Sequence, residues 1–542
     1  MSLYGVNRGL APTAIHVAAL RALIFRIQWS RVRAYFRSPG GDCSRWGSYL
    51  CKNVKCALWV ETTHCQVVFI PARCCQSNVA HDRMSSTSPR PTQVRYAVVL
   101  ATTLTAILLY LDRICMGQIA ENAAFKESLG GDQGKIGSVL SAFFLAYALA
   151  QVPAGWLSDR FGARAMMTFY VVMWSAFTAF TGIVTGFTML LVARIGCGLA
   201  QAGAYPTSGS LLGRWVPLRA RSRANSVVAF GGRLGGALAP VLTVALITGV
   251  ASWPGLGNWR TVLIIYGAVG IGVAGLFWWV FRERPEGHPR CNSAECELIN
   301  EGRARAVASS KAPPTIIPLR SLLTNRSMWL MCLSQWATNV GWVFLVTWLA
   351  TYLTSVKHVS SMRAGQMASV VLLAGMGGML CGGWLTDAAT RRLGLRWGRV
   401  VPLASSRFIA ALAYLVCLWF EAPWVAVAAF AMVAFMTDLG VPSTWSFMQD
   451  VGGRHVGSAL GWANMWGNLG AFVATKYLPP LLERWDTNHD WHVALIVCAA
   501  GFVVSGIASL GIDASACRWC RRKRKSQLTN RPRRAQIEPT FA

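Results

Sequence analysis

Charged side chains lie inside the longest apolar stretches of this sequence. The run that begins at Tyr96 carries no charge until Asp112 and Arg113, and two further apolar runs contain Arg233 and Asp438. A charged side chain at the centre of a bilayer costs roughly 2.5–3.5 kcal/mol even on a lenient insertion scale. Charges kept at that cost indicate chemistry, because an arginine can bind a carboxylate through two parallel hydrogen bonds and a carboxylic acid can carry a proton.

The elements that must hold these residues are membrane-spanning helices. The chain has 542 residues, of which 54% are hydrophobic and 14% charged, and its mean hydropathy is +0.40. A soluble domain is about 25% charged, so the composition predicts an all-α protein integral to the lipid bilayer. Runs of about 20 apolar residues are expected to cross the membrane. The twelve predicted spans lie near 96–118, 136–157, 165–186, 188–213, 224–248, 260–281, 327–354, 364–386, 399–420, 424–447, 456–478 and 491–512.

A polar stretch divides the spans into two groups of six, which is typical of transporters built from two related bundles. Lys and Arg are concentrated in alternate loops, with four between residues 214 and 223 and eight between 282 and 326. This bias predicts that both termini face the cytoplasm of a bacterial inner membrane. The predicted segments are two six-helix bundles at 84–282 and 326–513, a cytoplasmic loop at 283–325 and a basic tail at 514–542.

The remaining composition limits the partners and the class of activity. The net charge of +30 is expected to face anionic lipid rather than nucleic acid. Residues 1–83 are rich in Arg and Cys, so we predict that they form a disordered extension or that the chain starts at Met84. No zinc-protease, nucleophile-elbow or phosphate-loop motif is present, so we predict no enzyme, no catalytic residue, no metal and no cofactor.

Polar residues of different spans are expected at one level of the membrane. At 1.5 Å per residue, Tyr147, Gln201, Arg233 and Asp438 lie about 15–20 Å into their spans. That depth is near the midplane, where carriers with two related bundles bind substrate. The four residues therefore predict a central binding site.

Each of two arginines has two possible roles. Arg113 is predicted to bind a substrate carboxylate, together with Tyr110 on the same helix face. The alternative is a structural ion pair with Asp112, although adjacent residues on a helix diverge by about 100°. Arg233 can complement a second carboxylate or pair with Asp438.

The loop after the second span predicts a contact between helices. Its sequence "GWLSDRFGAR" matches G-x-L-x-D-R-x-G-x-R/K and so resembles the major facilitator superfamily, and "GGWLTDAATRR" repeats the pattern six spans later. Glycines allow close helix approach, and an aspartate can meet the N-terminus of a facing helix. The resemblance implies a conformational latch formed by Gly155, Asp159, Arg160, Gly162, Arg164, Asp387 and Arg391.

Longer segments resemble the anion:cation symporter family, which includes transporters of sugar acids of the hexonate and glucarate type. These segments are "YLDR", "GLAQAGAYP", "WRTVLIIYGAVGI", "RPEGHPRCNSAECELI", "TDLGVPSTWSFMQDVGGRHVG" and "GWANMWGNLGAF", within residues 90–512. The resemblance implies alternating access in a twelve-helix facilitator fold. It also implies that Arg113 binds the anion and that the preceding Asp112 is protonatable.

One position departs from that family. Proton-coupled sugar-acid carriers normally have a glutamate in the fourth span where this chain has Gln201, which cannot titrate. We therefore predict that Asp112, with Asp438 as a second group, carries the coupling proton. The alternative is that both acids stay paired with Arg113 and Arg233, which would make the protein a uniporter or an exchanger.

Other residues of the same spans complete the predicted site. Tyr147, Trp445, Asn464 and Asn468 are predicted to contact substrate beside Gln201, although each could instead pack between helices. We predict a monomeric importer that couples protons to a small organic anion, namely a sugar acid of the hexonate or hexuronate type. Transport of another organic or inorganic anion and a non-transporting membrane sensor are the alternatives.

Overall fold

The computed structural model describes residues 58–60, 67–69, 90–249, 254–301, 319–485 and 491–515. The chain divides into two units, Met1–Thr87 and Ser88–Ala542. In the first unit, strands β1 (Leu58–Val60) and β2 (Val67–Phe69) pair in antiparallel register. This hairpin is an addition to the predicted all-α fold. The rest of the predicted extension at 1–83, and the tail beyond residue 515, lie outside the described residues.

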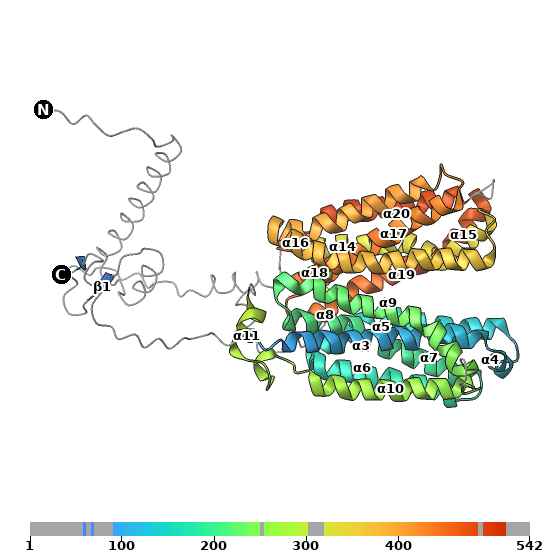
Figure 1. Cartoon of the computed structure of the whole chain (residues 1–542), viewed down its shortest axis with the longest axis horizontal. Coiled ribbons are helices and arrows are strands. Elements are labelled where there is room, and N and C mark those ends of the chain that lie inside the picture. Colours follow the sequence, from blue (N-terminus) through green and yellow to red (C-terminus); the bar gives the residue numbers. More distant parts are fainter. Residues whose placement is uncertain are drawn as a thin grey trace, which may run out of the picture. The chain divides into compact units, whose positions relative to one another are not determined.

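The first bundle of the second unit is drawn in blue to green in Figure 1. Its fourth span, Phe187–Trp215, runs through α7 and α8, and Ala202 and Gly203 between them keep a right-handed helical backbone. Gln201 therefore lies in the middle of this span. The helices are α3 (Val94–Glu121), α4 (Ala123–Ser128), α5 (Gln133–Phe161), α6 (Ala163–Ile183), α7 (Phe187–Gln201), α8 (Ala204–Trp215), η2 (Leu218–Ala220), α9 (Arg221–Thr248) and α10 (Trp259–Val280).

The second bundle is drawn in yellow to red. Its longest helix contains two predicted spans, and the backbone leaves the helical conformation between them at Gly394, where φ is 78°. The helices are α14 (Arg326–Val343), the π-helical η4 (Phe344–Trp348), α15 (Leu349–Ser355), α16 (Ser361–Val416), α17 (Pro423–Leu439), α18 (Val441–Gly452), α19 (Val456–Trp485) and α20 (His492–Leu510).

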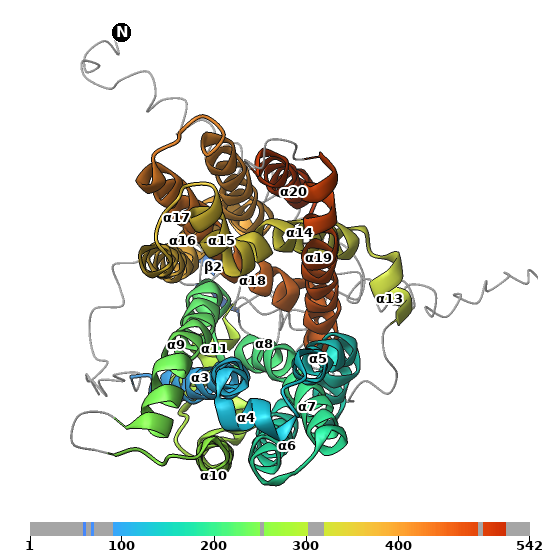
Figure 2. The same cartoon turned by 90° about the vertical axis from the view of Figure 1, so that its right-hand side faces the viewer.

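The described helices confirm the predicted all-α membrane fold of this unit. Ten described helical stretches, four of which join consecutive helices such as α7 and α8, are long and apolar enough to cross a membrane, and the one at Met362–Val416 contains two of the predicted spans. The 30-residue α19 corresponds to a further predicted span. Figure 2 shows the two bundles beside each other when viewed along the helices, with α5 facing α19 and α9 facing α16.

The segment between the bundles is anchored on the first one. It contains η3 (Pro285–Gly287), α11 (Ser293–Asn300) and α13 (Leu319–Thr324). Glu295 of α11 is buried and accepts hydrogen bonds from Thr92 Oγ1 at 2.5 Å and from the backbone N of Arg95 at 3.0 Å. Burial favours the neutral acid, but these hydrogen bonds and the Arg95 guanidinium outweigh it and lower the pKa of Glu295. Glu295 thus ties α11 to the start of α3.

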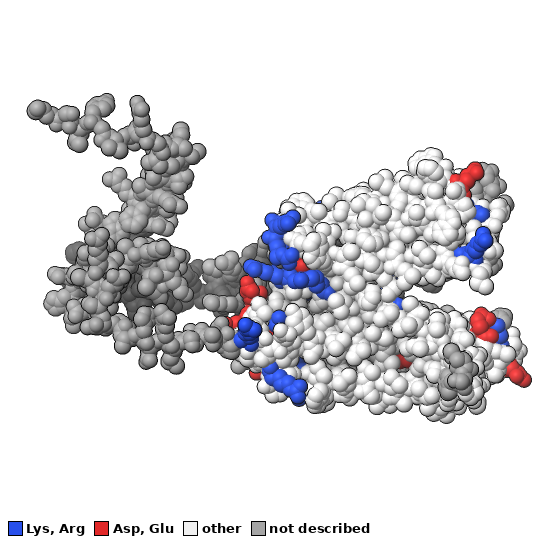
Figure 3. Space-filling view, in the orientation of Figure 1, with Lys and Arg blue, Asp and Glu red and all other residues white. Residues whose placement is uncertain are grey.

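The two ends of this unit differ in charge and in closure. We call them the α11 end and the α4 end, after the short helices that lie there. Figure 3 shows Lys and Arg gathered at the α11 end, a flank almost without charge, and an opening between the bundles at the α4 end. The contacts that join the bundles at the α11 end therefore close one side of the central site.

Candidate functional site

Arg113 of α3 lies in a cage of aromatic rings and one amide. Its guanidinium carbon is 4.3 Å from the ring centre of Tyr147, 5.1 Å from that of Tyr110 and 5.4 Å from that of Phe143. Arg113 Nε donates to Oε1 of the buried Gln201 at 3.2 Å, and Nη2 has no hydrogen-bond partner among the described residues. Cation–π contacts hold a guanidinium in place without using its N–H donors. Arg113 therefore keeps donors for an anionic ligand.

Asp112 points to a different part of the bundle. It is fully buried, and neither carboxylate oxygen has a hydrogen-bond partner among the described residues. Arg194 of α7 interacts with it electrostatically, and the Trp174 side chain of α6 is a further neighbour. The guanidinium of Arg194 lies 4.7 Å from the ring centre of Phe143, the ring that Arg113 also contacts. No ion pair joins Asp112 to Arg113 within the described chain, and each has separate neighbours.

A second charged cluster joins the two bundles. Arg233 Nη2 of α9 lies 3.0 Å from Asp438 Oδ1 of α17, and the Arg233 guanidinium carbon is 4.2 Å from the ring centre of Trp342. Arg407 of α16 is buried, interacts electrostatically with Asp438 and donates to the Thr437 carbonyl at 2.9 Å. Of the two roles that we considered for Arg233, the ion pair with Asp438 is present in this structure.

Two tyrosines lie between these clusters. The ring centre of Tyr205 is 6.2 Å from that of Tyr110 and 4.9 Å from that of Trp445 on α18. A Cβ at Gly232 would lie 2.4 Å from the Tyr205 hydroxyl and 3.0 Å from the Tyr110 ring. Gly232 therefore lets both rings pack against α9, one residue before Arg233.

Asn464 and Asn468 are half-buried on α19. The Nδ2 of Asn468 donates to the backbone carbonyl of Asn464 at 2.8 Å. Among the described residues, no hydrogen bond joins either asparagine to Arg113 or to Trp445. Their contact with substrate stays a prediction.

At the α11 end, an aspartate of α5 caps a helix of the other bundle. Asp159 accepts hydrogen bonds from the backbone N of Gly457 at 2.9 Å and from the backbone N and Oγ of Ser458 at 2.8 Å each. A Cβ on Gly155 would lie 2.2 Å from the Gly457 carbonyl oxygen, so only glycine fits there. The free N–H groups of a helix start carry partial positive charge, which an aspartate satisfies. We call this contact the first cap.

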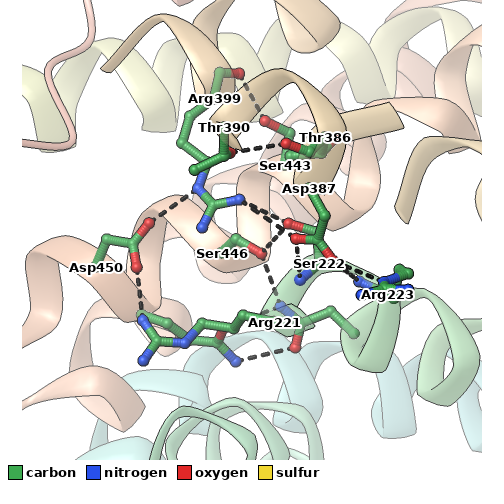
Figure 4. Close-up of polar contacts among 12 residues, drawn as sticks. Arg221, Ser222, Arg223, Thr386, Asp387, Thr390, Arg399, Ser443, Ser446 and Asp450 are labelled. Carbon is green, nitrogen blue, oxygen red and sulfur yellow. Dashed lines mark hydrogen bonds and ion pairs between the residues drawn. The ribbon is translucent and has the colours of Figure 1, made fainter. Parts of the chain in front are cut away.

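An equivalent contact starts from α16 (Figure 4). Asp387 accepts hydrogen bonds from the backbone N of Ser222 and of Arg223, each at 3.0 Å, and thereby caps α9. Arg223 Nε also lies 3.3 Å from Asp387. A Cβ on Gly383 would lie 2.2 Å from Ser226 Oγ. We call this contact the second cap.

The second cap is surrounded by further buried charges. Asp450 of α18 lies 2.6 Å from Arg221 Nη1 and 2.9 Å from Arg399 Nε. Arg399 is fully buried, donates to Ser222 Oγ at 2.7 Å and lies 4.0 Å from Asp387. Figure 4 shows that these side chains converge from both bundles. Asp450 and its two arginines were not singled out in the sequence, because they lie at span ends where loop charges are expected.

The other predicted latch residues are Gly162, Arg164, Arg160 and Arg391. Gly162 has a φ of 95° and separates α5 from α6. Arg164 donates to the Trp278 carbonyl at 2.7 Å and stacks 3.9 Å from that ring centre. Arg160 lies over neighbouring aromatic rings, and Arg391 is exposed.

Arg407 is a further buried charge, which we did not predict from the sequence. It lies in the apolar run that forms the ninth predicted span, so the depth argument applied to Arg233 would have selected it. Among the described residues, no group of three or more His, Cys, Asp or Glu side chains is placed to hold a metal ion.

This combination of two helical bundles, interbundle caps and a central arginine site defines a class of membrane transporter. The family model of the Major Facilitator Superfamily matches residues 102–475, and the chain belongs to that superfamily. It is therefore an integral membrane transporter and not an enzyme, as the sequence predicted.

Two curated relatives are named as probable transporters of sugar acids. The chain is 27% identical over 449 residues to the probable L-galactonate transporter of Escherichia coli strain K12, covering 81% of this chain and 94% of the relative. It is 26% identical over 402 residues to the probable galactarate/D-glucarate transporter GudP of Bacillus subtilis strain 168, covering 71% and 85%. The solved structure of the fucose:proton symporter of Escherichia coli has the same fold, with a TM-score of 0.59, 15% identity and coverage of 78% and 98%. The predicted resemblance to sugar-acid transporters is confirmed.

Proposed function

We propose that this protein imports a sugar acid together with protons across a bacterial inner membrane. The observation that carries the proposal is the Arg113 cage, in which aromatic rings and Gln201 hold the guanidinium while Nη2 keeps free donors. A planar guanidinium binds a carboxylate through two parallel hydrogen bonds. The hydroxyls of Tyr110 and Tyr147 beside it suit the polyol chain of a hexonate or hexuronate. The names of the curated relatives support the same substrate class.

The proposed orientation places the α11 end in the cytoplasm. Lys and Arg gather at that end in Figure 3, as loops facing the cytoplasm do. With both caps formed there and an opening at the α4 end, the central site is accessible from outside. Transport then requires that the caps at Asp159 and Asp387 separate and that the α4 end closes. In this proposal the two caps act as the conformational latch.

The proposed proton site is Asp112, which lies behind Arg113. Protonation of Asp112 would remove its electrostatic interaction with Arg194, and Arg194 shares the Phe143 ring with Arg113. A change in the charge of Asp112 is thus coupled, through Arg194 and the Phe143 ring, to the position of Arg113. Asp438 is the second proposed proton site, since its partner Arg233 also faces the tyrosines.

A uniporter or exchanger is the second candidate function, and one contact favours it. The residue that accepts from Arg113 Nε is the amide of Gln201, which cannot release or take up a proton. If Asp112 and Asp438 stay ionised throughout the cycle, an anion would cross without a proton.

Counterflow of labelled galactonate and glucuronate into proteoliposomes tests the proposal. Wild-type protein is expected to exchange at least one of these acids, and Arg113→Lys should weaken binding at least about tenfold because it keeps the charge but loses the fork. Arg260→Lys is a matched control, since Arg260 donates to the Val184 carbonyl away from the site. A protonophore should abolish uphill uptake. Uptake that is unaffected would favour the exchanger, and binding without counterflow would favour a sensor.

A further inference from the structure

The charges of the central site do not balance. The central site holds three guanidinium groups: Arg233 and Arg407 share the carboxylate of Asp438, and Arg113 lies over Tyr147 and Tyr110 without an ion pair among the described residues. Asp112 and Arg194 behind Phe143 carry opposite charges and interact electrostatically, so they add no net charge. The site therefore has an excess of two positive charges. Uncompensated charge is costly in a low-dielectric interior, so the site favours a ligand that carries two negative charges.

Arg233 is the member of the second cluster that a ligand can reach. Its side chain is 27% exposed, whereas that of Asp438 is 2% exposed, and Arg407 is fully buried. Asp438 uses Oδ1 to contact Arg233, and its Oδ2 has no hydrogen-bond partner among the described residues. If Arg233 turned to a ligand, Asp438 would keep Arg407 as an electrostatic partner. The ion pair between the bundles is thus exchangeable without leaving a carboxylate uncompensated.

The two reachable arginines flank the same pair of tyrosines. Arg113 stacks on Tyr110, and the residue before Arg233 packs against both Tyr110 and Tyr205. Trp342 holds the Arg233 guanidinium from the other side at 4.2 Å. A chain that bears an acid at each end could place one acid on each arginine and its middle hydroxyls along the tyrosines.

We propose that Arg233 is a second anion-binding residue. In the absence of substrate, Asp438 pairs with Arg233 in the position that the second carboxylate of the substrate takes on binding. This inference rests on the proposed function and narrows its substrate class from sugar acids to acyclic diacids, with an acid at both ends of a polyol chain. When the diacid binds, its second carboxylate takes the Arg233 donors and Asp438 turns to Arg407. The substrate thereby replaces an ion pair that holds the bundles together.

Galactarate and galactonate provide the matched test, because they share a carbon chain and differ at one end, where a carboxylate replaces a hydroxymethyl group. Binding of both acids is measured by thermal shift and by competition in counterflow. Wild-type protein is expected to prefer galactarate at least about tenfold, as a charge-assisted pair of hydrogen bonds would give. Arg233→Gln should remove that preference, because it weakens galactarate binding much more than galactonate binding. Arg233→Lys should give an intermediate preference, because the charge remains but the fork and the stacking on Trp342 are lost.

The outcomes separate this inference from the proposed function. Equal affinity of wild-type protein for the two acids, or an unchanged galactarate preference in Arg233→Gln, would overturn the inference while the proposed function stands. If Arg233→Gln and Arg233→Lys both lose both acids, Arg233 is structural and the inference is wrong. A wild-type protein that responds to neither acid would refute the proposed function and the inference together. Arg113→Gln should lose both acids, which distinguishes the shared carboxylate site from the second one.

Discussion

The first and second caps use the same backbone geometry with different electrostatics. In each, an aspartate of one bundle satisfies two N–H groups at the start of a helix in the other bundle, and a glycine one turn earlier allows the helices to touch. Around Asp159 the donors are two backbone N–H groups and one hydroxyl. Around Asp387 lie Arg223 and Arg399.

Because of this difference, we expect the two caps to open in different ways. In the first cap Asp159 accepts hydrogen bonds from a helix N-terminus and a hydroxyl and interacts electrostatically with Arg214, so its strength depends mainly on a few hydrogen bonds. The second cap belongs to a network of three arginines and two aspartates, in which removal of one member leaves another buried charge uncompensated. We expect the second cap to open only when several of its contacts break together, whereas the hydrogen bonds of the first cap can break one at a time.

Arg399→Leu is expected to have the largest effect on this comparison. It would leave Asp450 with Arg221 alone and remove a partner of Asp387, which should destabilise the closed α11 end by about 3–5 kcal/mol. The measurement is the distance between dyes on cysteines placed at Arg219 and Leu393 in a variant without native cysteines. Arg396→Leu, an exposed position on the same helix, is the control. Equal distances in the two variants would contradict a structural role of the network.

Neutralising the two aspartates compares the caps directly. Asp387→Asn should destabilise the closed α11 end by about 3 kcal/mol, because Arg223 and Arg399 lose the charge of a carboxylate. Asp159→Asn should cost about 1 kcal/mol, since an amide oxygen still accepts from a helix N-terminus and only the charge is lost. The same pair of dyes reports both variants. If the order were reversed, the second cap would not owe its strength to its arginines.

The glycines should show the opposite order. A Cβ at Gly155 would lie 2.2 Å from the backbone oxygen of Gly457, whereas at Gly383 the two atoms met first belong to the Ser226 side chain, Oγ at 2.2 Å and Cβ at 2.7 Å. Gly155→Ala is therefore expected to lower the free energy of unfolding by about 2 kcal/mol, and Gly383→Ala to lower it by about 1 kcal/mol. Thermal unfolding of the purified variants measures the difference. A larger loss for Gly383→Ala would show that the nearby Arg223 backbone, at 3.0 Å, decides the contact there.

The smallest expected effect is a dependence of the first cap on pH. Burial, followed by the charge of Arg454, lowers the pKa of His455 to about 4, and His455 directly precedes α19, whose start Asp159 caps. Because the folded pKa lies below the unfolded value of about 6.5, the neutral ring stabilises the fold above that pH, and this stability is lost as the pH falls toward 4. The two pKa values give about 2 kcal/mol at pH 5, and after a discount for solvent screening we expect a loss of about 1 kcal/mol. Unfolding at pH 7 and pH 5 should differ less in His455→Gln, and an equal difference in both proteins would exclude this histidine.

Much of the architecture was predictable because membrane insertion depends on local and additive properties. The apolar runs predicted the spans to within a few residues, and the polar stretch before Arg326 predicted the division into two bundles. The loop motif likewise predicted that Asp159 would meet a helix start.

The site was predictable only in part. The depth of Arg113 and the three-residue spacing from Tyr110 follow from helix geometry, and the structure places the guanidinium over that ring. Asp450 and Arg399 had no comparable signal, because charges at span ends are common wherever loops face the cytoplasm.

The sequence by itself determined which segments enter the membrane, the residues that carry charge into it and the helix face on which Arg113 lies, because each depends on neighbours within a few turns. Only the tertiary structure decided that Asp112 faces Arg194 rather than Arg113, and that Arg233 pairs with an aspartate 205 residues away. Which charges meet depends on how the helices of two bundles pack, and no spacing along one helix contains that information.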